Sequence, residues 1–186
     1  FQIENLACSV GCCLALGLKD KDIIKVIPKI QNPKGRAEVA GRLNNGSKIL
    51  VDYAHTPDAL KNILLANVNN KRKPSVVFGC GGNREVSKRR IMGNIANKFA
   101  NKVYITDDNP RNENPSKIRK KIITGCKKAI EIPSRELAIK TAINDLEKNE
   151  TLIIAGKGHE NKQIIGKKII KFDDLVLVKK ILNKKN

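Results

Sequence analysis

The sequence predicts an α/β fold, a mainly parallel sheet with helices on both faces, and three observations lead to it. From residue 49 onward, short apolar runs alternate with longer helical stretches, an order typical of parallel strands joined by crossover helices. The apolar residues are 40% of the chain and aromatic residues only 3%, which predicts a core of Ile, Leu and Val. Polar segments follow directly after several of the runs, at the edge where open α/β sheets bind ligands.

Two helices are predicted before the first strand. Residues 5–18 carry apolar residues at helical spacing and meet a plausible stop at Gly17. Residues 20–30 are expected to form a second, shorter helix. Cys8 and Cys12 are one helical turn apart in an apolar stretch, so we expect them to be buried as small apolar side chains.

A domain boundary is predicted near Pro33. Pro33 and Gly35 interrupt the helical pattern, as expected of a linker. Residues 1–33 therefore read as a helical piece separate from residues 34–186, whose length suits one complete α/β domain.

Beyond the boundary, strand and helix patterns alternate regularly. The predicted strands span residues 49–52, 75–78, 103–105 and 151–155, and a further apolar stretch covers residues 129–132. The predicted helices span residues 57–67, 88–100, 116–128 and 173–182, and another begins after its predicted N-cap, Ser134. A hairpin is expected over residues 162–172, with its turn at Gly166 and Lys167.

Composition limits the classes of protein to consider. No apolar run approaches the ~20 residues that a transmembrane helix needs, and the first residues show neither an initiator methionine nor a basic leader. The five cysteines are odd in number and contain no CxxC pair, which argues against a disulfide framework and against a zinc site. We therefore expect a reduced, cytoplasmic protein without a membrane partner.

The net charge of +19 has two interpretations. Lysine-rich surfaces bind phosphate backbones, so the charge could indicate a nucleic-acid-binding module. However, the lysines are spread along the whole chain together with many Asn and Ile residues, as in proteins of AT-rich genomes. The chain has no Trp, two Tyr and four Phe, too few for stacking on bases. We favour compositional bias and expect no nucleic-acid partner.

The loop over residues 106–111 is the strongest single motif. It follows the predicted strand at residues 103–105 and holds acidic, amide and guanidinium side chains close together. Arg111 can grip a carboxylate through two parallel hydrogen bonds, while Asp108 and Asn109 offer acceptors to an ammonium. Such a set suits a zwitterionic ligand, although Asp, Asn and Pro are also ordinary turn residues.

A glycine-rich loop, FGCGGNR over residues 78–84, lies between a predicted strand and a predicted helix. Its glycines would allow close backbone approach to a ligand, and a helix N-terminus attracts anions. The spacing matches neither a dinucleotide-binding nor a P-loop fingerprint. A tight turn after a buried strand would explain the glycines, but it would leave Arg84 unexplained.

Five motifs together resemble one known family, in the same order along the chain. They are GRAEV at residues 35–39, VDYAHTPDAL at 51–60, FGCGGNRE at 78–85, TDDNPR at 106–111 and AGKGHE at 155–160. The chain resembles the C-terminal part of the UDP-N-acetylmuramoyl-tripeptide synthetases, the meso-diaminopimelate-adding Mur ligases. The resemblance implies that residues 34–186 form the Rossmann-like C-terminal amino-acid-binding domain. It implies that residues 1–33 are a helical remnant of the central ATPase domain.

The resemblance also implies a binding site for meso-diaminopimelate. Its residues would be Arg84, Asp108, Asn109, Pro110, Arg111, Gly156 and Glu160. In this assignment Arg111 holds the distal carboxylate, which lysine lacks, and Glu160 receives the distal ammonium. Lys157 and His159 are interpreted as solvated loop residues without a chemical role.

The implied nucleotide contacts are more dispersed. By resemblance, Asn5 lies near adenine, Arg36 reaches the phosphates, Asp52 holds the ribose and His55 lies beside it. The alternatives are that Asn5 is an N-cap and that Asp52 caps a strand end before Pro57 starts a helix. Without a nearby nucleophile, an Asp–His pair does not indicate hydrolysis, and we assign no catalytic residue and no metal ligand to this chain.

In the whole enzyme, the resemblance implies an ATP-dependent and Mg²⁺-dependent ligation of meso-diaminopimelate to UDP-MurNAc-L-Ala-D-Glu for peptidoglycan. The family's phosphate loop, magnesium-binding glutamate and carbamylated lysine are absent from this sequence, so we expect no turnover by the chain alone. Its partners would be the N-terminal and central domains. Another amide ligase of the superfamily, such as cyanophycin or folylpolyglutamate synthetase, is the nearer alternative, but TDDNPR and AGKGHE argue against it.

Overall fold

The computed structural model describes residues 2–69 and 71–184. The chain divides into two compact units, Phe1–Pro33 and Lys34–Asn186, and each is described by itself. Within the described residues, none of the helices has both the length and the apolar character required to cross a membrane.

The first unit consists of α1 (Gln2–Ala15), α2 (Asp20–Val26) and the short 3₁₀ helix η1 (Ile27–Lys29). Gly17 has a φ of +83°, so the predicted stop is confirmed as a left-handed residue after α1. The second predicted helix ends as an α-helix at Val26, because Pro28 lacks an N–H and its ring crowds the preceding turn.

Most apolar side chains of the first unit are exposed. Leu16 is 80% and Ile24 63% exposed, and Cys8 and Cys12 are exposed as well. The expectation that these two cysteines are buried is therefore wrong within this unit. The physical reason is that two helices contact each other along only one stripe, so their remaining apolar faces have no cover inside the unit.

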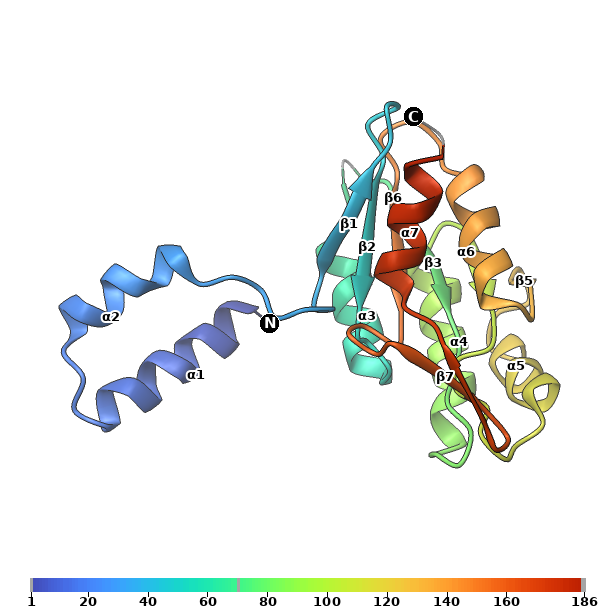
Figure 1. Cartoon of the computed structure of the whole chain (residues 1–186), viewed down its shortest axis with the longest axis horizontal. Helices are drawn as coiled ribbons and strands as arrows, with labels where there is room; N and C mark the ends of the chain where they lie inside the picture. The colour runs from blue at the N-terminus through green and yellow to red at the C-terminus, as the bar shows by residue number, and fades with distance from the viewer. Residues whose placement is uncertain (1, 70, 185–186) are drawn as a thin grey trace. The chain divides into compact units, whose positions relative to one another are not determined.

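The second unit contains a six-stranded sheet in the order β1-β2-β6-β3-β4-β5 (Figure 1). The strands are β1 (Glu38–Arg42), β2 (Lys48–Asp52), β3 (Ser75–Phe78), β4 (Val103–Ile105), β5 (Ile130–Glu131) and β6 (Thr151–Ala155). All neighbouring pairs are parallel except β1–β2, which is antiparallel. The sequence interpretation missed β1, because only Ala40 of that strand is buried and the strand lacks an apolar run.

Helices cover both faces of the sheet. One face packs against α3 (Pro57–Ala66), α4 (Ser87–Phe99) and α5 (Pro115–Ile123), and the other against α6 (Arg135–Asn144) and α7 (Asp174–Leu182). Figure 1 shows α6 and α7 together along one side of the sheet. This arrangement confirms the predicted mainly parallel α/β fold.

Alternating strand residues build the two cores. In β2, Leu50 joins the core under α3 and α4, while its neighbours Ile49 and Val51 join the core under α6 and α7. The same alternation separates Phe78 from Val77 in β3. The strands β2, β3, β4 and β6 are apolar on both faces, and this explains why they appear in the sequence as unbroken apolar runs.

Local sequence signals set most helix boundaries. Thr56 caps α3 by accepting a hydrogen bond from Ala59 N, with Pro57 in the first turn. Ser134 caps α6 through Leu137 N, as predicted. The helix predicted over residues 116–128 ends earlier, at Ile123. Just after it, Gly125 lies so close to Arg90 O that a Cβ would be 2.2 Å away.

A separate two-stranded hairpin consists of β7 (Lys162–Ile165) and β8 (Lys168–Lys171). Its turn falls at Gly166 and Lys167, so the predicted hairpin is confirmed. Arg111 N donates to Ile164 O at 3.0 Å, and Gly166 N donates to Arg111 O at 2.7 Å. These bonds attach the hairpin to the loop that follows β4.

Candidate functional site

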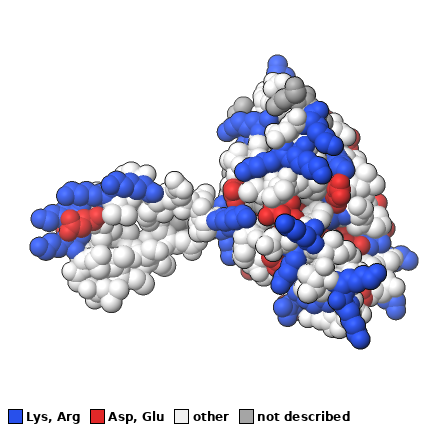
Figure 2. Space-filling view, in the orientation of Figure 1, with Lys and Arg blue, Asp and Glu red and all other residues white. Residues whose placement is uncertain are grey.

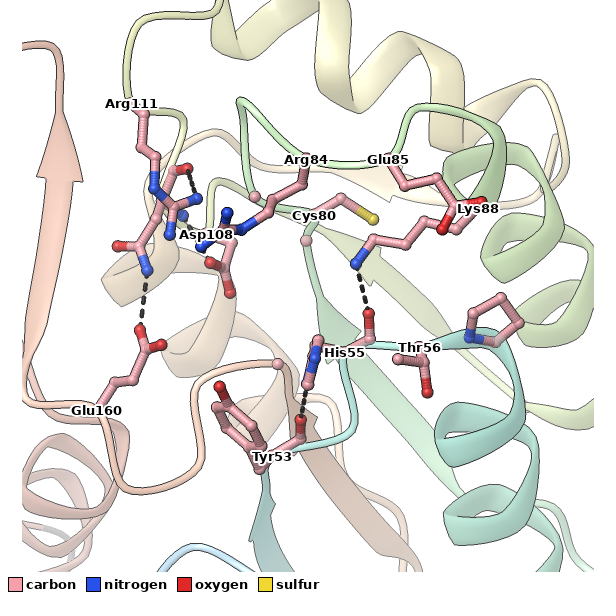
Figure 3. A pocket seen from close by; sticks show the side chains of 15 residues that line it. Tyr53, His55, Thr56, Cys80, Arg84, Glu85, Lys88, Asp108, Arg111 and Glu160 are labelled. Carbon is pink, nitrogen blue, oxygen red and sulfur yellow. Dashed lines mark hydrogen bonds between the residues drawn. The ribbon is translucent and has the colours of Figure 1, made fainter.

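Four loops meet at the carboxyl edge of the sheet, after β2, β3, β4 and β6, and they enclose a cleft of about 380 Å³. The cleft is lined by Tyr53, His55, Thr56, Pro57, Gly79, Cys80, Gly81, Arg84, Glu85, Lys88, Asp108, Asn109, Arg111, Gly156 and Glu160. Figure 3 shows Arg111, Asp108 and Glu160 at one end and Lys88 and Thr56 at the other. Parallel strands bring these distant segments to one edge.

The glycine-rich loop after β3 packs backbone to backbone on the loop after β4. A Cβ at Gly79 would lie 2.2 Å from Thr106 O, and one at Gly82 would lie 1.9 Å from Pro110 O. Gly82 N donates to Asn109 O at 2.9 Å. The expected close approach of these glycines is therefore to a neighbouring loop, and it fixes that loop in the cleft wall.

Arg111 is half-buried and held at both its backbone and its side chain. Its φ of +50° is in the left-handed region, which is unusual for arginine, and its backbone is bonded to the hairpin. Nη1 donates to Gly82 O at 2.9 Å and to Asn109 O at 3.4 Å. The guanidinium carries five N–H donors in total, so it retains donors for a carboxylate.

Asn109 lies at the centre of a hydrogen-bond network. Its Oδ1 accepts from Ile164 N at 2.9 Å and from Lys157 Nζ at 3.2 Å. Its Nδ2 donates to Glu160 Oε2 at 2.8 Å. The sequence interpretation offered Asn109 as an acceptor for a ligand ammonium, but both lone-pair directions of Oδ1 already have donors from the protein.

Lys157 is fully buried, with none of its surface exposed. Its Nζ donates to Asn109 Oδ1, to Glu160 Oε2 at 3.1 Å and to Lys162 O at 2.6 Å. The expectation that Lys157 is a solvated loop residue is therefore wrong. Burial of an ammonium is tolerated because each of its three donors has an acceptor. His159, in contrast, is exposed as expected.

Two carboxylates in the cleft have opposite pKa shifts. Burial raises the pKa of Asp108, and the positive charges of Arg135 and Lys157 only partly oppose this effect. Burial also raises the pKa of Glu160, but the hydrogen bonds from Asn109 and Lys157 and nearby positive charge outweigh it, so its pKa is lowered overall. Glu160 is therefore ionised over the neutral range and is suited to bind an ammonium.

Arg84 brings positive charge to the middle of the cleft, and Lys88 brings it to the end opposite Glu160 (Figure 3). Arg84 is exposed, and Lys88 donates from Nζ to His55 O at 2.8 Å. With Arg111, they give the cleft three cations, while Glu85, Asp108 and Glu160 supply three carboxyl groups. The cleft can therefore bind a ligand that carries both carboxylate and ammonium groups.

Gly156 and Pro110 shape the site through the backbone. Gly156 has a φ of +112°, and a Cβ there would lie 2.9 Å from Asp108 Oδ2. Glycine is required for both reasons. Pro110 is buried outside the cleft lining and its carbonyl accepts from Glu113 N at 3.1 Å, so it supports the turn.

The predicted nucleotide residues are not brought together in the same way. Arg36 is exposed and its guanidinium lies over the Tyr53 ring, 4.7 Å from the ring centroid. Asp52 is buried, and its carboxylate accepts from Ala37 N and from Ala54 N, both at 2.7 Å. These bonds agree with the strand-end alternative for Asp52.

His55 and Asn5 complete the predicted nucleotide set. His55 lines the cleft and its Nδ1 donates to Tyr53 O at 2.9 Å. Asn5 lies inside α1 of the first unit, so the alternative that it is an N-cap is wrong. The structure does not place Asn5 relative to the cleft.

Sequence reasoning missed several buried polar residues beneath the cleft. Arg135 binds Asp174 through two hydrogen bonds of 2.8 and 2.7 Å, and both side chains are fully buried. Arg135 also donates to Ala155 O at 3.1 Å, at the end of β6. Gln163 donates to Asp108 O at 2.7 Å. Only their positions next to strand or helix ends could have indicated them, because their partners are distant in sequence.

Charge elsewhere on the second unit is dispersed. In the view of Figure 2, Lys and Arg side chains are scattered over its visible surface with carboxylates between them. Among residues 2–69 and 71–184, no three His, Cys, Asp or Glu side chains cluster closely enough to hold a metal ion.

The fold and cleft define a class of α/β domain with a cleft of mixed charge at the carboxyl edge of its sheet. The chain belongs to the Mur ligase family, because residues 35–158 match the family model described as "Mur ligase, glutamate ligase domain". The resemblance noted in the sequence is thereby confirmed.

Curated proteins with similar sequences support this family assignment. A "UDP-N-acetylmuramoyl-L-alanyl-D-glutamate--2,6-diaminopimelate ligase" of Buchnera aphidicola subsp. Baizongia pistaciae is 44% identical over 191 residues, covering 100% of this chain and 37% of that protein. The proteins of the same name from Rickettsia felis and Rickettsia rickettsii are 47% and 49% identical, covering 98% of this chain in each case and 35% and 38% of those proteins. The chain thus spans little more than a third of the curated relatives it matches.

Solved structures support the fold. A structure titled as the same 2,6-diaminopimelate ligase aligns with a TM-score of 0.75 at 35% identity, covering 99% of this chain and 38% of that chain. E. coli FolC in complex with ADP aligns with a TM-score of 0.64 at 15% identity, covering 82% of this chain and 36% of that chain. At that identity the second likeness concerns the fold alone.

Proposed function

We propose that this chain is the amino-acid-binding part of an ATP-dependent ligase that adds meso-diaminopimelate to UDP-MurNAc-L-Ala-D-Glu in peptidoglycan synthesis. In this proposal, residues 34–186 are the C-terminal domain and residues 1–33 are the end of the central ATPase domain. The observation that carries the proposal is the mixed charge of the cleft, where Arg84 and Arg111 face Asp108 and Glu160. A diaminopimelate molecule has two carboxylates and two amino groups, and it requires such a set.

The arginines would bind the carboxylates. Arg84 is exposed in the middle of the cleft, so it can adapt to a carboxylate near the reacting amine. Arg111 is fixed by Gly82 O and by the hairpin, as expected of a residue that selects one geometry. We assign the distal carboxylate to Arg111, because a rigid guanidinium recognises a planar carboxylate with little loss of side-chain freedom.

Glu160 would receive the distal ammonium. Its Oε2 is bonded to Asn109 and Lys157, while the described residues provide no hydrogen bond to its Oε1. The lowered pKa of Glu160 keeps it ionised at neutral pH. Asp108, Pro110 and Gly156 would complete the site as cleft wall and backbone support.

The nucleotide would be ATP with Mg²⁺, held mainly by parts of the enzyme outside this chain. When bound, ATP supplies the phosphoryl group that activates the D-glutamyl carboxylate. Arg36 and His55 are exposed and fit contacts to a nucleotide, whereas Asp52 fits less well because both oxygens already bind backbone amides. Asn5 remains a proposed adenine contact.

The contribution of this chain to the reaction would be positional. Arg84, Arg111 and Glu160 would hold three charged groups of the amino acid, so its remaining amine is directed at the activated carboxyl group. Holding a nucleophile in this way supplies much of the rate enhancement of a two-substrate reaction. We further propose a cytoplasmic location, where the UDP-linked substrate and the amino acid meet.

A hybrid enzyme tests the proposal. The residues of the Buchnera relative that precede the matched region would be joined to residue 1 of this chain, since the match covers the whole chain. Release of ADP should depend on meso-diaminopimelate and on UDP-MurNAc-L-Ala-D-Glu, with L-lysine a poor substitute. The complete Buchnera enzyme, purified identically, is the control. A soluble hybrid that uses neither amino acid, or both equally well, would contradict the proposal.

A further inference from the structure

Lys157 is the most deeply buried cation at the cleft, yet it does not line the cavity. It belongs to the loop after β6, between Gly156 and Gly158. Its ammonium has three donors, and each has one acceptor: Asn109 Oδ1, Glu160 Oε2 and Lys162 O. Two of these acceptors are side chains of the proposed amino-acid site. Lys157 therefore contacts the site from behind.

The first consequence concerns the orientation of Asn109. Its Oδ1 faces Lys157 Nζ and Ile164 N, which are both donors. An amide turned by 180° would place its NH₂ group against those donors, so the observed orientation is the one that Lys157 favours. This orientation directs Asn109 Nδ2 toward Glu160 Oε2, 2.8 Å away.

The second consequence concerns the orientation and charge of Glu160. Oε2 takes both protein donors, from Lys157 and from Asn109, so the carboxylate rotation is fixed and Oε1 remains for a ligand. The charged groups around Glu160 are Lys157 on its own loop, Arg111 and Asp108 on the loop after β4, and Arg135 at the start of α6. Of the cations among them, only Lys157 forms a hydrogen bond to Glu160.

We infer that Lys157 is a positioning residue for amino-acid recognition: it fixes the Asn109 amide and orients the Glu160 carboxylate, so that one oxygen is turned to the ligand's distal ammonium. This inference rests on the proposed function for the identity of the ligand. The roles of Asn109 and Glu160 within the network follow from the contacts alone. Lys157 touches no reacting group and acts through Glu160.

The test compares the 186-residue chain with its Lys157→Met variant, which keeps an unbranched side chain, one heavy atom shorter, but removes charge and donors. Carbon-13 NMR of the Glu160 carboxyl group gives its pKa, and calorimetry gives the affinity for meso-diaminopimelate between pH 4 and pH 8. We expect the Glu160 pKa to rise in the variant and the affinity at pH 7 to fall about tenfold or more, since a charge-assisted hydrogen bond is lost.

The sign of the pH dependence follows from the lowered pKa of Glu160 in the wild type. Binding of an ammonium requires ionised Glu160, so affinity persists above that pKa and is lost as the pH falls through it. In Lys157→Met the loss should begin at a higher pH. A purely structural role for Lys157 would lower stability without moving this pH profile.

Controls separate the possible outcomes. Lys167→Met removes an equal charge from the exposed hairpin turn and should change neither quantity. Adding Lys157→Met to Glu160→Gln should weaken binding no further, because Lys157 acts through Glu160. If Lys157→Met does not fold, Lys157→Gln, which keeps two donors without charge, takes its place.

Two results are decisive. If the wild type binds meso-diaminopimelate and a folded Lys157→Met variant has the same Glu160 pKa and affinity, the inference is wrong. If the wild type does not bind meso-diaminopimelate but the Glu160 pKa rises in the variant, the proposed function fails while Lys157 still controls Glu160.

Discussion

The proposed amino-acid half of the site and the proposed nucleotide half are organised differently within the second unit. In the amino-acid half, Asn109, Lys157 and Glu160 form one buried network that leaves a charged oxygen toward the cleft. In the nucleotide half, both oxygens of Asp52 bind backbone amides, and Arg36 packs on Tyr53 at the surface. The first half is preorganised, whereas the second is not assembled by this unit.

A sequence motif alone therefore does not show whether its residues are free to bind a ligand. Asp52 is the last residue of the buried strand β2, and Asp108 follows the buried strand β4. Asp52 is used to bind the backbone of residues 37 and 54, while Asp108 lines the cleft with a raised pKa caused first by burial. The surroundings, and not the residue type, decide which carboxylate is available.

The largest effect is expected on the free energy of unfolding, from the buried Arg135–Asp174 pair beneath the amino-acid half. Asp174→Ala would leave Arg135 buried without its carboxylate partner, and breaking such a pair costs about 3–5 kcal/mol of unfolding free energy. Lys140→Met, which breaks the exposed Lys140–Glu136 pair, should cost below about 0.5 kcal/mol. Urea unfolding of the chain measures both. Similar small losses for the two variants would show that the buried pair does not support this half.

A large effect on specificity is expected from Arg111→Ala in the hybrid enzyme. Losing one partner of a desolvated charge pair costs about 2–5 kcal/mol, so kcat/KM for meso-diaminopimelate should fall far more than the already poor value for L-lysine. Glu160→Ala should reduce both, since both amino acids carry a distal ammonium. Equal losses of the two substrates in Arg111→Ala would refute the assignment of the distal carboxylate.

A smaller effect is expected from Gly156→Ala. The new Cβ would lie 2.9 Å from Asp108 Oδ2 at a φ of +112°, a strain of about 1–3 kcal/mol. Gly166→Ala, at a φ of +57° with nothing within 4 Å of the new Cβ, is the matched control because it adds only backbone strain. Calorimetry should show weaker meso-diaminopimelate binding in Gly156→Ala alone. Unchanged affinity there would remove Gly156 from the proposed site.

The weakest binding is expected between this chain and nucleic acid. The positive side chains visible in Figure 2 are scattered and interrupted by carboxylates, so any binding to DNA or RNA should be weak, nonspecific and lost at moderate salt. Fluorescence anisotropy with labelled oligonucleotides at two salt concentrations measures it. A sequence-specific complex that survives physiological salt would favour a nucleic-acid-binding module instead.

Much of the fold could be predicted because its signals are local. The strands β2, β3, β4 and β6 contain unbroken apolar runs, and Ser134 caps its helix through a residue three positions away. The edge strand β1 lacks such a run, since only Ala40 is buried. Its pairing with β2 is visible only in three dimensions.

The candidate site could be predicted only in part. The motifs placed Arg84, Arg111 and Glu160 at strand ends, and the parallel topology then brings them to one cleft. The burial of Lys157 could not be predicted, because one of its acceptors, Asn109, lies 48 residues away in the sequence and the loop that turns Glu160 and Lys162 toward it has no regular pattern. A buried charge depends on partners that local sequence does not reveal.

Calorimetry of the 186-residue chain with meso-diaminopimelate, L-lysine and ATP, each titrated separately at pH 7, tests the contrast between the two halves most directly. The account predicts that meso-diaminopimelate binds, that L-lysine binds at least about tenfold more weakly through loss of the Arg111 contact, and that ATP binding is weaker still. Binding of ATP without measurable binding of meso-diaminopimelate would contradict it.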